Sequence, residues 1–185
     1  MSTMIRLTVV ATMLTVLTAV CFIQPAMSGD TTKLDLAVDK TLKKLYAKSP
    51  AAAAVSKKAK AVLMFPSVTK VGFLVGGQYG EGALIMEGKT VGYYNTLAGS
   101  YGLQAGAQKF GYALFFMDTA SLEYLNKSDG WEIGVGPSVV VVDEGMAKTM
   151  TSTTVHEGIY AFIFSQQGLM AGLGIQGTKI TKINP

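Results

Sequence analysis

The chain has almost none of the residues on which common catalytic and metal sites depend. Its 185 residues include one cysteine, Cys21, one histidine, His156, and one arginine, Arg6. A single histidine and a single cysteine cannot assemble a transition-metal site of a familiar type. The lack of arginine after Arg6 speaks against nucleic-acid recognition, because the arginine guanidinium is the preferred donor of paired hydrogen bonds to phosphates and bases. We therefore expect no metal, no cofactor and no nucleic-acid partner.

Motifs of nucleotide-binding and hydrolytic enzymes are also missing. GLGIQG, residues 172–177, has the letters of a dinucleotide-binding loop, but only eight residues follow it and none is acidic. The motif requires a helix after the turn and an acidic residue about 20 positions later, so a strand and a turn are the better interpretation. No G-x-S-x-G sequence is present to supply a nucleophilic serine. A hydrolase built around His156 is the least favoured of three hypotheses, and we expect no enzyme.

The first 28 residues have the three parts of a secretory signal peptide. Arg6 is the only charge before Asp30, an apolar run covers residues 7–23, and Ala26-Met27-Ser28 supplies small residues before a cleavage site. We expect cleavage after Ser28 and a periplasmic protein, which could also associate with the envelope. The alternatives are an uncleaved anchor helix and a lipoprotein modified at Cys21, although the sequence TAVC matches a lipoprotein signal poorly.

Positive charge is concentrated directly after this leader. Residues 30–60 contain eight lysines and three aspartates, a net charge of +5, whereas residues 61–185 have a net charge of −2. One interpretation is a solvated helix face. The other is a surface attracted to anionic lipid headgroups, where each lysine contributes about 1 kcal/mol. The residues predicted to touch lipid are Lys43, Lys44, Lys57, Lys58, Lys60 and Lys70.

Two helices are predicted ahead of the sheet. Leu34, Val38, Leu42, Leu45 and Tyr46 recur at the spacing of one helix face, and Ser49-Pro50 offers a new cap and first turn for a second helix. From Ala61 onward, glycine-rich segments of β-branched and aromatic residues indicate many short strands, with a turn at residues 87–89. One short helix capped by Asp118 interrupts them. The predicted fold is α+β, with a mainly antiparallel, glycine-rich sheet closing toward a barrel or sandwich.

Residues 99–117, GSYGLQAGAQKFGYALFFM, form the most unusual segment. Gln104, Gln108 and Lys109 are costly in a membrane-spanning helix, whereas large and small residues alternate as in a strand. The alternation changes parity near residues 108–110, which predicts a bulge, a bend or a new strand there. We therefore expect a strongly bent strand, in which the glycines permit curvature or close approach of another backbone.

Four stretches of the chain resemble the SYLF family, also called the Ysc84 actin-binding domain. They are AKAVLMFPSVTKVGFLVGGQYGEGALI, YYNTLAGSYGLQAGAQKFGYALFFM, DGWEIGVGPSVVVV and FSQQGLMAGLGIQGTKI. The resemblance covers about residues 37–183. In place of an arginine common after the GEGAL block, this chain has Ile85-Met86. The interpretation by segments is a signal peptide at 1–28, a basic amphipathic helical segment at 29–60 and a glycine-rich β domain at 61–185, with 29–185 forming one SYLF-like domain.

The resemblance implies lipid binding, which eukaryotic members carry out on phosphoinositides with a basic N-terminal segment. Bacterial members are secreted envelope proteins, so neither actin nor phosphoinositides are expected partners here. The leading hypothesis is a non-catalytic envelope protein that binds anionic phospholipid or another lipid through its lysines and apolar surface. The alternative is a structural or protein-interaction module of the periplasm, with other envelope proteins as partners.

Overall fold

The computed structural model describes residues 31–126, 130–142, 158–168, 175 and 177–184, with the backbone alone described at 73, 74 and 100–105. The predicted signal peptide with Cys21, the residue His156 and most of the GLGIQG motif lie outside the described residues. The helices and strands are α2 (Thr31–Lys48), α3 (Pro50–Ser56), β1 (Ala61–Met86), β2 (Lys89–Phe116), α4 (Thr119–Glu123), the 3-10 turn η2 (Tyr124–Asn126), β3 (Trp131–Glu132), β4 (Val139–Val142), β5 (Ile159–Gly168) and β6 (Lys179–Ile183).

The two predicted N-terminal helices are present, and they separate at the predicted residue. Ser49 is extended and its hydroxyl oxygen accepts a hydrogen bond from the Ala52 amide at 3.2 Å, while Pro50 opens α3. A serine cap followed by proline in the first turn favours the start of a helix. The serine side chain accepts a hydrogen bond from a free amide, and proline has no amide N–H that would be left unpaired. The predicted short helix is also confirmed, with the Asp118 carboxylate accepting from the Ser121 amide at 2.6 Å.

A single long hairpin dominates the sheet, where many short strands were expected. β1 has 26 residues and β2 has 28, and they pair from Ala61 opposite Phe116 to Met86 opposite Lys89. The predicted turn is confirmed: Glu87 and Gly88 have φ values of 51° and 75°, which suit a tight hairpin turn. Pro66 lies inside β1, although proline usually ends a strand. β1 passes through it in an irregular step between Phe65 and Val68, as an edge strand allows.

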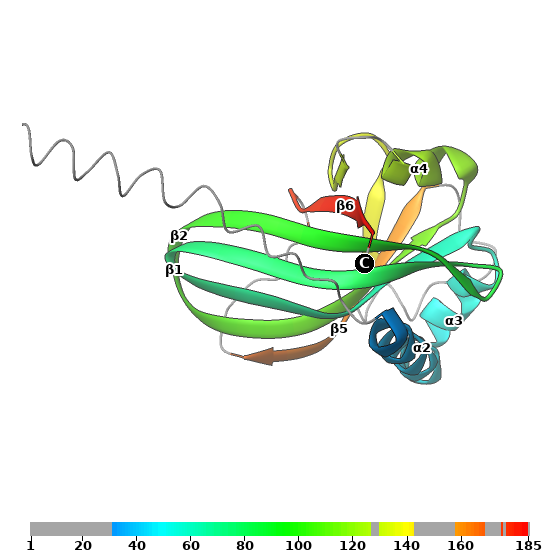
Figure 1. Cartoon of the computed structure of the whole chain (residues 1–185), viewed down its shortest axis with the longest axis horizontal. Helices are drawn as coiled ribbons and strands as arrows, with labels where there is room; N and C mark the ends of the chain where they lie inside the picture. Colours follow the sequence, from blue (N-terminus) through cyan, green and yellow to red (C-terminus); the bar gives the residue numbers. More distant parts are fainter. Residues whose placement is uncertain (1–30, 127–129, 143–157, 169–174, 176, 185) are drawn as a thin grey trace, which may run out of the picture.

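The hairpin folds back on itself. Figure 1 shows both strands running to one end of the molecule, curving there and returning. The bend lies near residue 74, since a methyl group on Gly72 would come within 2.9 Å of the Gly76 backbone. Further from the bend, a methyl group on Gly80 would lie 2.7 Å from the Val68 side chain. β2 pairs with β1 through this bend, so the prediction of a strongly bent strand over residues 99–117 is confirmed. In that segment Gly111 makes a close contact, with the Phe164 ring, whereas an added methyl group on Gly99 or Gly106 has nothing within 4 Å.

Sheet pairing is irregular where the sequence pattern changes parity. Beside Phe110 and Gly111 of β2, each of the two neighbouring strands carries one extra residue. On β1 it lies between Phe65 and Val68, and on β5 it lies between Phe164 and Gln167. In β5 the extra residue coincides with Ser165, whose φ is 54°. The bulges thus lie on the two partner strands and β2 itself continues without a break. The predicted irregularity is confirmed, and its position on the neighbours is the new detail.

β2 organises the remaining strands. One of its edges pairs with β1 along its length, and the other pairs with β6 over residues 93–97 and with β5 over residues 108–116. The full order is β3-β6-β2-β5-β4, all antiparallel except the parallel pair of β4 and β5. Because β2 bends between its two sets of partners, the sheet curls. The predicted α+β class with a mainly antiparallel sheet curling toward a barrel is confirmed.

Two clusters of buried side chains occupy the two faces of this curl. The inner cluster contains Phe65, Tyr94, Tyr112, Trp131 and Ile180 among its larger members. Its polar centre is a hydrogen bond of 2.6 Å between the hydroxyls of Thr96 and Tyr112. The outer cluster joins α2 and α3 to the other face of the sheet through Val38, Val55, Met64, Phe115 and Phe162. The helices therefore cover the outer face only where the hairpin begins and ends.

Candidate site: a groove between the helices and the sheet

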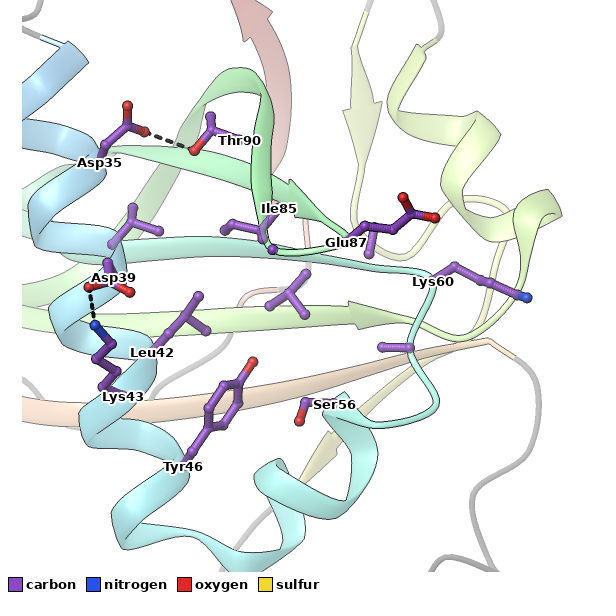
Figure 2. Close-up of a pocket in the computed structure, with 15 residues that line it drawn as sticks. Asp35, Asp39, Leu42, Lys43, Tyr46, Ser56, Lys60, Ile85, Glu87 and Thr90 are labelled. Atoms are coloured by element: carbon purple, nitrogen blue, oxygen red, sulfur yellow. Dashed lines mark hydrogen bonds and ion pairs between the residues drawn. The ribbon is translucent and has the colours of Figure 1, made fainter.

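A groove of about 600 Å³ lies between α2 and the root of the β1–β2 hairpin. Figure 2 shows α2 on one side of it, the end of α3 and the following link below, and the hairpin turn above. Its apolar lining consists of Val38, Leu42, Tyr46, Ala59, Ala61, Val62 and Ile85. A volume of this size lies within the range of small-molecule sites, which are mostly apolar with a few polar groups.

The apolar wall from α2 follows directly from the sequence. Val38, Leu42 and Tyr46 recur at intervals of four residues, so they lie on one face of the helix. Val38 is buried against the sheet, while Leu42 and Tyr46 are partly buried beside it. Burial raises the pKa of the Tyr46 hydroxyl, and a hydrogen bond with the Ser56 side chain opposes part of that rise. The periodicity thus predicted this wall, although it did not predict an opening beside it.

Asp35 fastens α2 to the sheet at one end of the groove. Its two carboxylate oxygens accept hydrogen bonds from the Thr90 hydroxyl at 3.0 Å and the Tyr93 hydroxyl at 2.9 Å. Both donors belong to β2, more than fifty residues away in sequence, so the contact fixes the height of the helix over the hairpin. No sequence signal predicts this contact, because nothing local pairs an aspartate with a distant strand.

Charges of both signs surround the opening of the groove. Asp39 and Lys43 form an ion pair of 2.6 Å on α2, and Lys60 and Glu87 lie on the side toward the hairpin turn. Together with Asp35, the lining has three carboxylates and two ammonium groups. Exposed ion pairs such as Asp39 with Lys43 hold each other weakly, so the Lys43 ammonium can be redirected to another anion at small cost.

The structure gathers only some of the lysines predicted to touch lipid. Lys43 and Lys60 line the groove. Lys44 is exposed on α2 outside the groove lining, and Lys57 and Lys58 are exposed in the turn after α3. Lys70 lies in the distal part of β1, away from the helices. Five of the six lysines therefore belong to the helical end of the molecule and one to its opposite end.

Lys70 has unusual neighbours on the inner side of the bend. The arms of β1 are symmetric about residue 74, which brings Lys70 level with Gln78, and Lys70 also pairs in register with Gln108. Both glutamines are buried, with exposed fractions of 4% and 6%. Within the described part of the chain, the Gln78 amide nitrogen and the Gln108 carbonyl oxygen have no hydrogen-bond partner. Alternation along the strands was the only sequence signal that could have placed these polar groups inside.

Two further features bear on the chemistry of the described residues. Within the part of the chain that the structure describes, no three side chains of His, Cys, Asp or Glu gather to hold a metal ion. Among the described helices, none has the length and hydropathy needed to cross a membrane. The groove lining itself offers apolar contacts, hydrogen-bonding groups, two ammonium groups and three carboxylates.

Comparison with protein families gives one match. Residues 97–184 match a family model described as "Ysc84: Las17-binding protein actin regulator". No curated protein matches the chain. The matched segment begins in β2 and reaches the end of β6, and it includes the GLQAGAQ and QQGLMAG blocks that carried the resemblance. The description refers to binding, so a binding module is the coarse function that the match supports, and residues 97–184 match the Ysc84, or SYLF, family that the sequence resembles.

Proposed function

We propose that this protein is a non-catalytic lipid-binding protein of the bacterial cell envelope, exported to the periplasm and associated with anionic lipid through its N-terminal helices. The observation that supports this function best is the apolar groove of about 600 Å³ that opens beside Lys43 and Lys60. An amphiphile has the same two parts, an apolar chain and a charged head. The groove can hold the chain while the two ammonium groups meet the head.

The apolar part of the interaction would come from the groove lining. Val38, Leu42 and Ile85 approach the groove from the helix and from the sheet, so an acyl chain placed between them would contact both layers. Burying apolar area contributes about 25 cal/mol per Å². The Tyr46 hydroxyl, which points into the groove in Figure 2, would supply a hydrogen bond to an ester or carboxyl oxygen.

The charged part would come from the basic segment as a whole. Residues 30–60 have a net charge of +5, and Lys57 and Lys58 add exposed ammonium groups close to Lys60. Each lysine near an anionic bilayer contributes about 1 kcal/mol, an attraction that salt screens within a Debye length of about 8 Å at physiological ionic strength. The helical end would thus reach the membrane first, and the groove would take up a single lipid there.

Sedimentation with lipid vesicles tests the proposal. The protein should sediment with vesicles that contain phosphatidylglycerol, less with vesicles of phosphatidylcholine alone, and less at high salt. Changing Lys57, Lys58 and Lys60 together to Glu should weaken sedimentation strongly, whereas Lys182→Glu on β6 is the control and should weaken it far less. Binding that ignores salt and the triple change would contradict the electrostatic mechanism.

A second candidate function is a protein-interaction module of the periplasm. The family description favours it, because it names a protein as the binding partner of that family. Crosslinking in intact cells followed by mass spectrometry distinguishes the two functions. One defined envelope protein recovered with a chain that ignores vesicles would support the interaction module and contradict lipid binding.

A further inference from the structure

The far end of the β1–β2 hairpin exposes apolar side chains on a face that no described element covers. Four of them lie on the outer face, near the bend: Val71, Val75, Tyr79 and Leu97, with exposed fractions of 51%, 65%, 38% and 55%. Tyr79 and Leu97 are directly opposite each other in the β1–β2 register, so their side chains are neighbours. We call these four residues the tip patch.

The tip patch continues the face that the helices cover at the other end of the hairpin. Ala83 and Ile85 belong to the outer cluster under α2, and Val75 and Tyr79 follow them at even intervals along β1. Side chains at even intervals lie on one face of a strand. Apolar side chains therefore recur on this face up to eight residues past Ala83, on the order of 25 Å at the usual rise of a strand, with Gly77 and Glu81 between them. Figure 1 shows this part of the hairpin projecting at the end opposite to α2 and α3.

Lysines outnumber acids around the tip patch. Residues 66–80 and 97–110 contain two charged residues, Lys70 and Lys109, and no acid. Lys109 is exposed and Lys70 partly exposed. The first acid beyond the patch is Glu81, whose carboxylate accepts a hydrogen bond from the Tyr79 hydroxyl at 2.7 Å. An apolar face with the exposed Lys109 beside it and a tyrosine at its border matches the boundary between lipid chains and anionic headgroups.

We propose that the tip patch inserts into the interface of a bilayer that contains anionic lipid, as a second membrane contact in addition to the N-terminal helices. This inference rests on the proposed lipid-binding function and assigns it a surface. Insertion would be shallow. Residues 98–107 of β2 pair with β1 on one edge and have no strand on the other within the described part of the sheet, so their free polar groups must stay in the hydrated headgroup region.

A second copy of the chain fits the tip patch less well. A symmetric contact would bring the lysines of two copies around one apolar patch, with Glu81, which already accepts a hydrogen bond from Tyr79, as the acid beside them. Anionic headgroups provide the missing negative charge. The charge complementarity therefore favours lipid, and self-association is an outcome that the experiment must detect.

Single-cysteine variants provide the test. Cys21 is the only cysteine of the chain, so Cys21→Ser leaves one introduced thiol for an environment-sensitive fluorophore. The exported protein would be labelled at Val75→Cys in the tip patch, at Leu36→Cys on α2 and at Val135→Cys as a control, positions exposed by 65%, 67% and 58%. With vesicles containing phosphatidylglycerol, the label at 75 should shift its emission to the blue, and the label at 135 should not.

The outcomes separate this inference from the proposed function. A shift at 36 without a shift at 75 would overturn the tip patch as a membrane contact and leave lipid binding intact. No shift at any position, with no sedimentation, would overturn both. A shift at 75 without lipid, together with a doubled mass in light scattering, would overturn the inference in favour of a dimer.

Variants of the tip give an independent readout. Val75→Asp should weaken vesicle binding about tenfold or more, since it replaces an apolar contact with a charge that the anionic surface repels. Lys109→Gln should weaken it about fivefold, the effect of losing one lysine near such a surface. The matched controls Val135→Asp and Lys182→Gln should bind as the unchanged protein does. Equal loss in controls and tip variants would contradict the assignment.

Discussion

Single glycines permit the two arms of the hairpin to lie in contact. A methyl group on Gly82 would overlap the carbonyl oxygen of Met64 and lie 2.6 Å from the Phe65 ring. Because the obstacle includes backbone, no rotation of a side chain relieves it. The residue thus sets how closely the arms approach, and the inner cluster depends on that distance.

We expect Gly82→Ala to lower the free energy of unfolding by about 1–3 kcal/mol, the usual cost of forcing an atom into packed space. Chemical denaturation followed by circular dichroism measures this change. Gly77→Ala is the control, since a methyl group there has nothing within 4 Å, and its effect should be below about 1 kcal/mol in either direction. Equal losses from the two changes would contradict the close-contact explanation.

Asp118 stabilises two segments with one carboxylate. It accepts hydrogen bonds from the Ser121 amide at 2.6 Å and, from 40 residues away, the Gly158 amide at 2.7 Å. Burial acts to raise the pKa of Asp118, but the hydrogen bonds from these amides outweigh it and lower the pKa below its ordinary value of 3.8. The carboxylate thus joins α4 to the start of β5.

Asp118→Ala should destabilise the protein by about 1–2 kcal/mol at neutral pH, the range for removal of a helix cap. The pKa is lower in the folded state than in the unfolded state, so this stabilisation is present above about pH 4 and is lost as pH falls through the lowered value. Urea titrations at several pH values should show the two proteins converging in acid. A difference that stays constant down to pH 2 would contradict the linkage.

At the scale of elements, α2 depends on Asp35 for its attachment to the hairpin. Asp35→Ala removes two hydrogen bonds to β2, and we expect a loss of about 1–2 kcal/mol and faster amide hydrogen exchange in residues 31–48. Asp39→Ala is the matched control in the same helix. It removes only an exposed ion pair with Lys43, worth about 0.3–0.5 kcal/mol, so exchange should stay unchanged. Equal exchange in both variants would contradict the attachment.

Much of the element structure could be predicted because its signals are local. Ser49-Pro50, Asp118 and Glu87-Gly88 fix the helix starts and the hairpin turn within a few residues of themselves. The lengths of β1 and β2 could not be predicted, because glycines and Pro66 normally end strands. Here the distant arm packs over the glycines, and the bulge between Phe65 and Val68 carries the strand past the proline. Such tertiary contacts leave no mark in the local sequence.

The candidate site was predictable to a similar extent. Helical periodicity predicted the apolar face of α2, and the charge run predicted the lysines near it. The groove itself depends on how far α2 lies above the sheet, which Asp35, Thr90 and Tyr93 determine. The sequence pattern places Asp39 in a helix and Glu87 in a turn, but it does not indicate that both acids lie at the opening of the groove. Their effect on the site arises in three dimensions.

At the scale of the whole molecule, the two basic regions lie at opposite ends. The helical segment carries most of the lysines, and the bend carries Lys70 and Lys109. Both proposed membrane contacts belong to one molecule. Once one end has bound, the other end is held near the same membrane at a high effective concentration. Removing either contact alone should then weaken membrane binding, and the remaining contact should still bind in its own orientation.

Export of the protein is a prediction at this scale. We expect the periplasmic form to begin at Gly29 and to contain no cysteine, because the signal peptide would remove Cys21 with residues 1–28. Intact-mass spectrometry of protein from the periplasmic fraction measures its N-terminus. A chain that begins at Cys21 with attached acyl groups would contradict cleavage after Ser28 and establish a lipoprotein.

The shared strand β2 also determines how the gene product can be divided. The family match begins at residue 97, inside β2, so a fragment cut there would keep β5 and β6 but lose all of β1 and the first arm of β2. Such a fragment would expose the aromatic rings of the inner face and would aggregate when expressed alone. The smallest fragment that can fold therefore begins at or before the first residue of β1. Any exchange of this module between genes must include both arms of the hairpin.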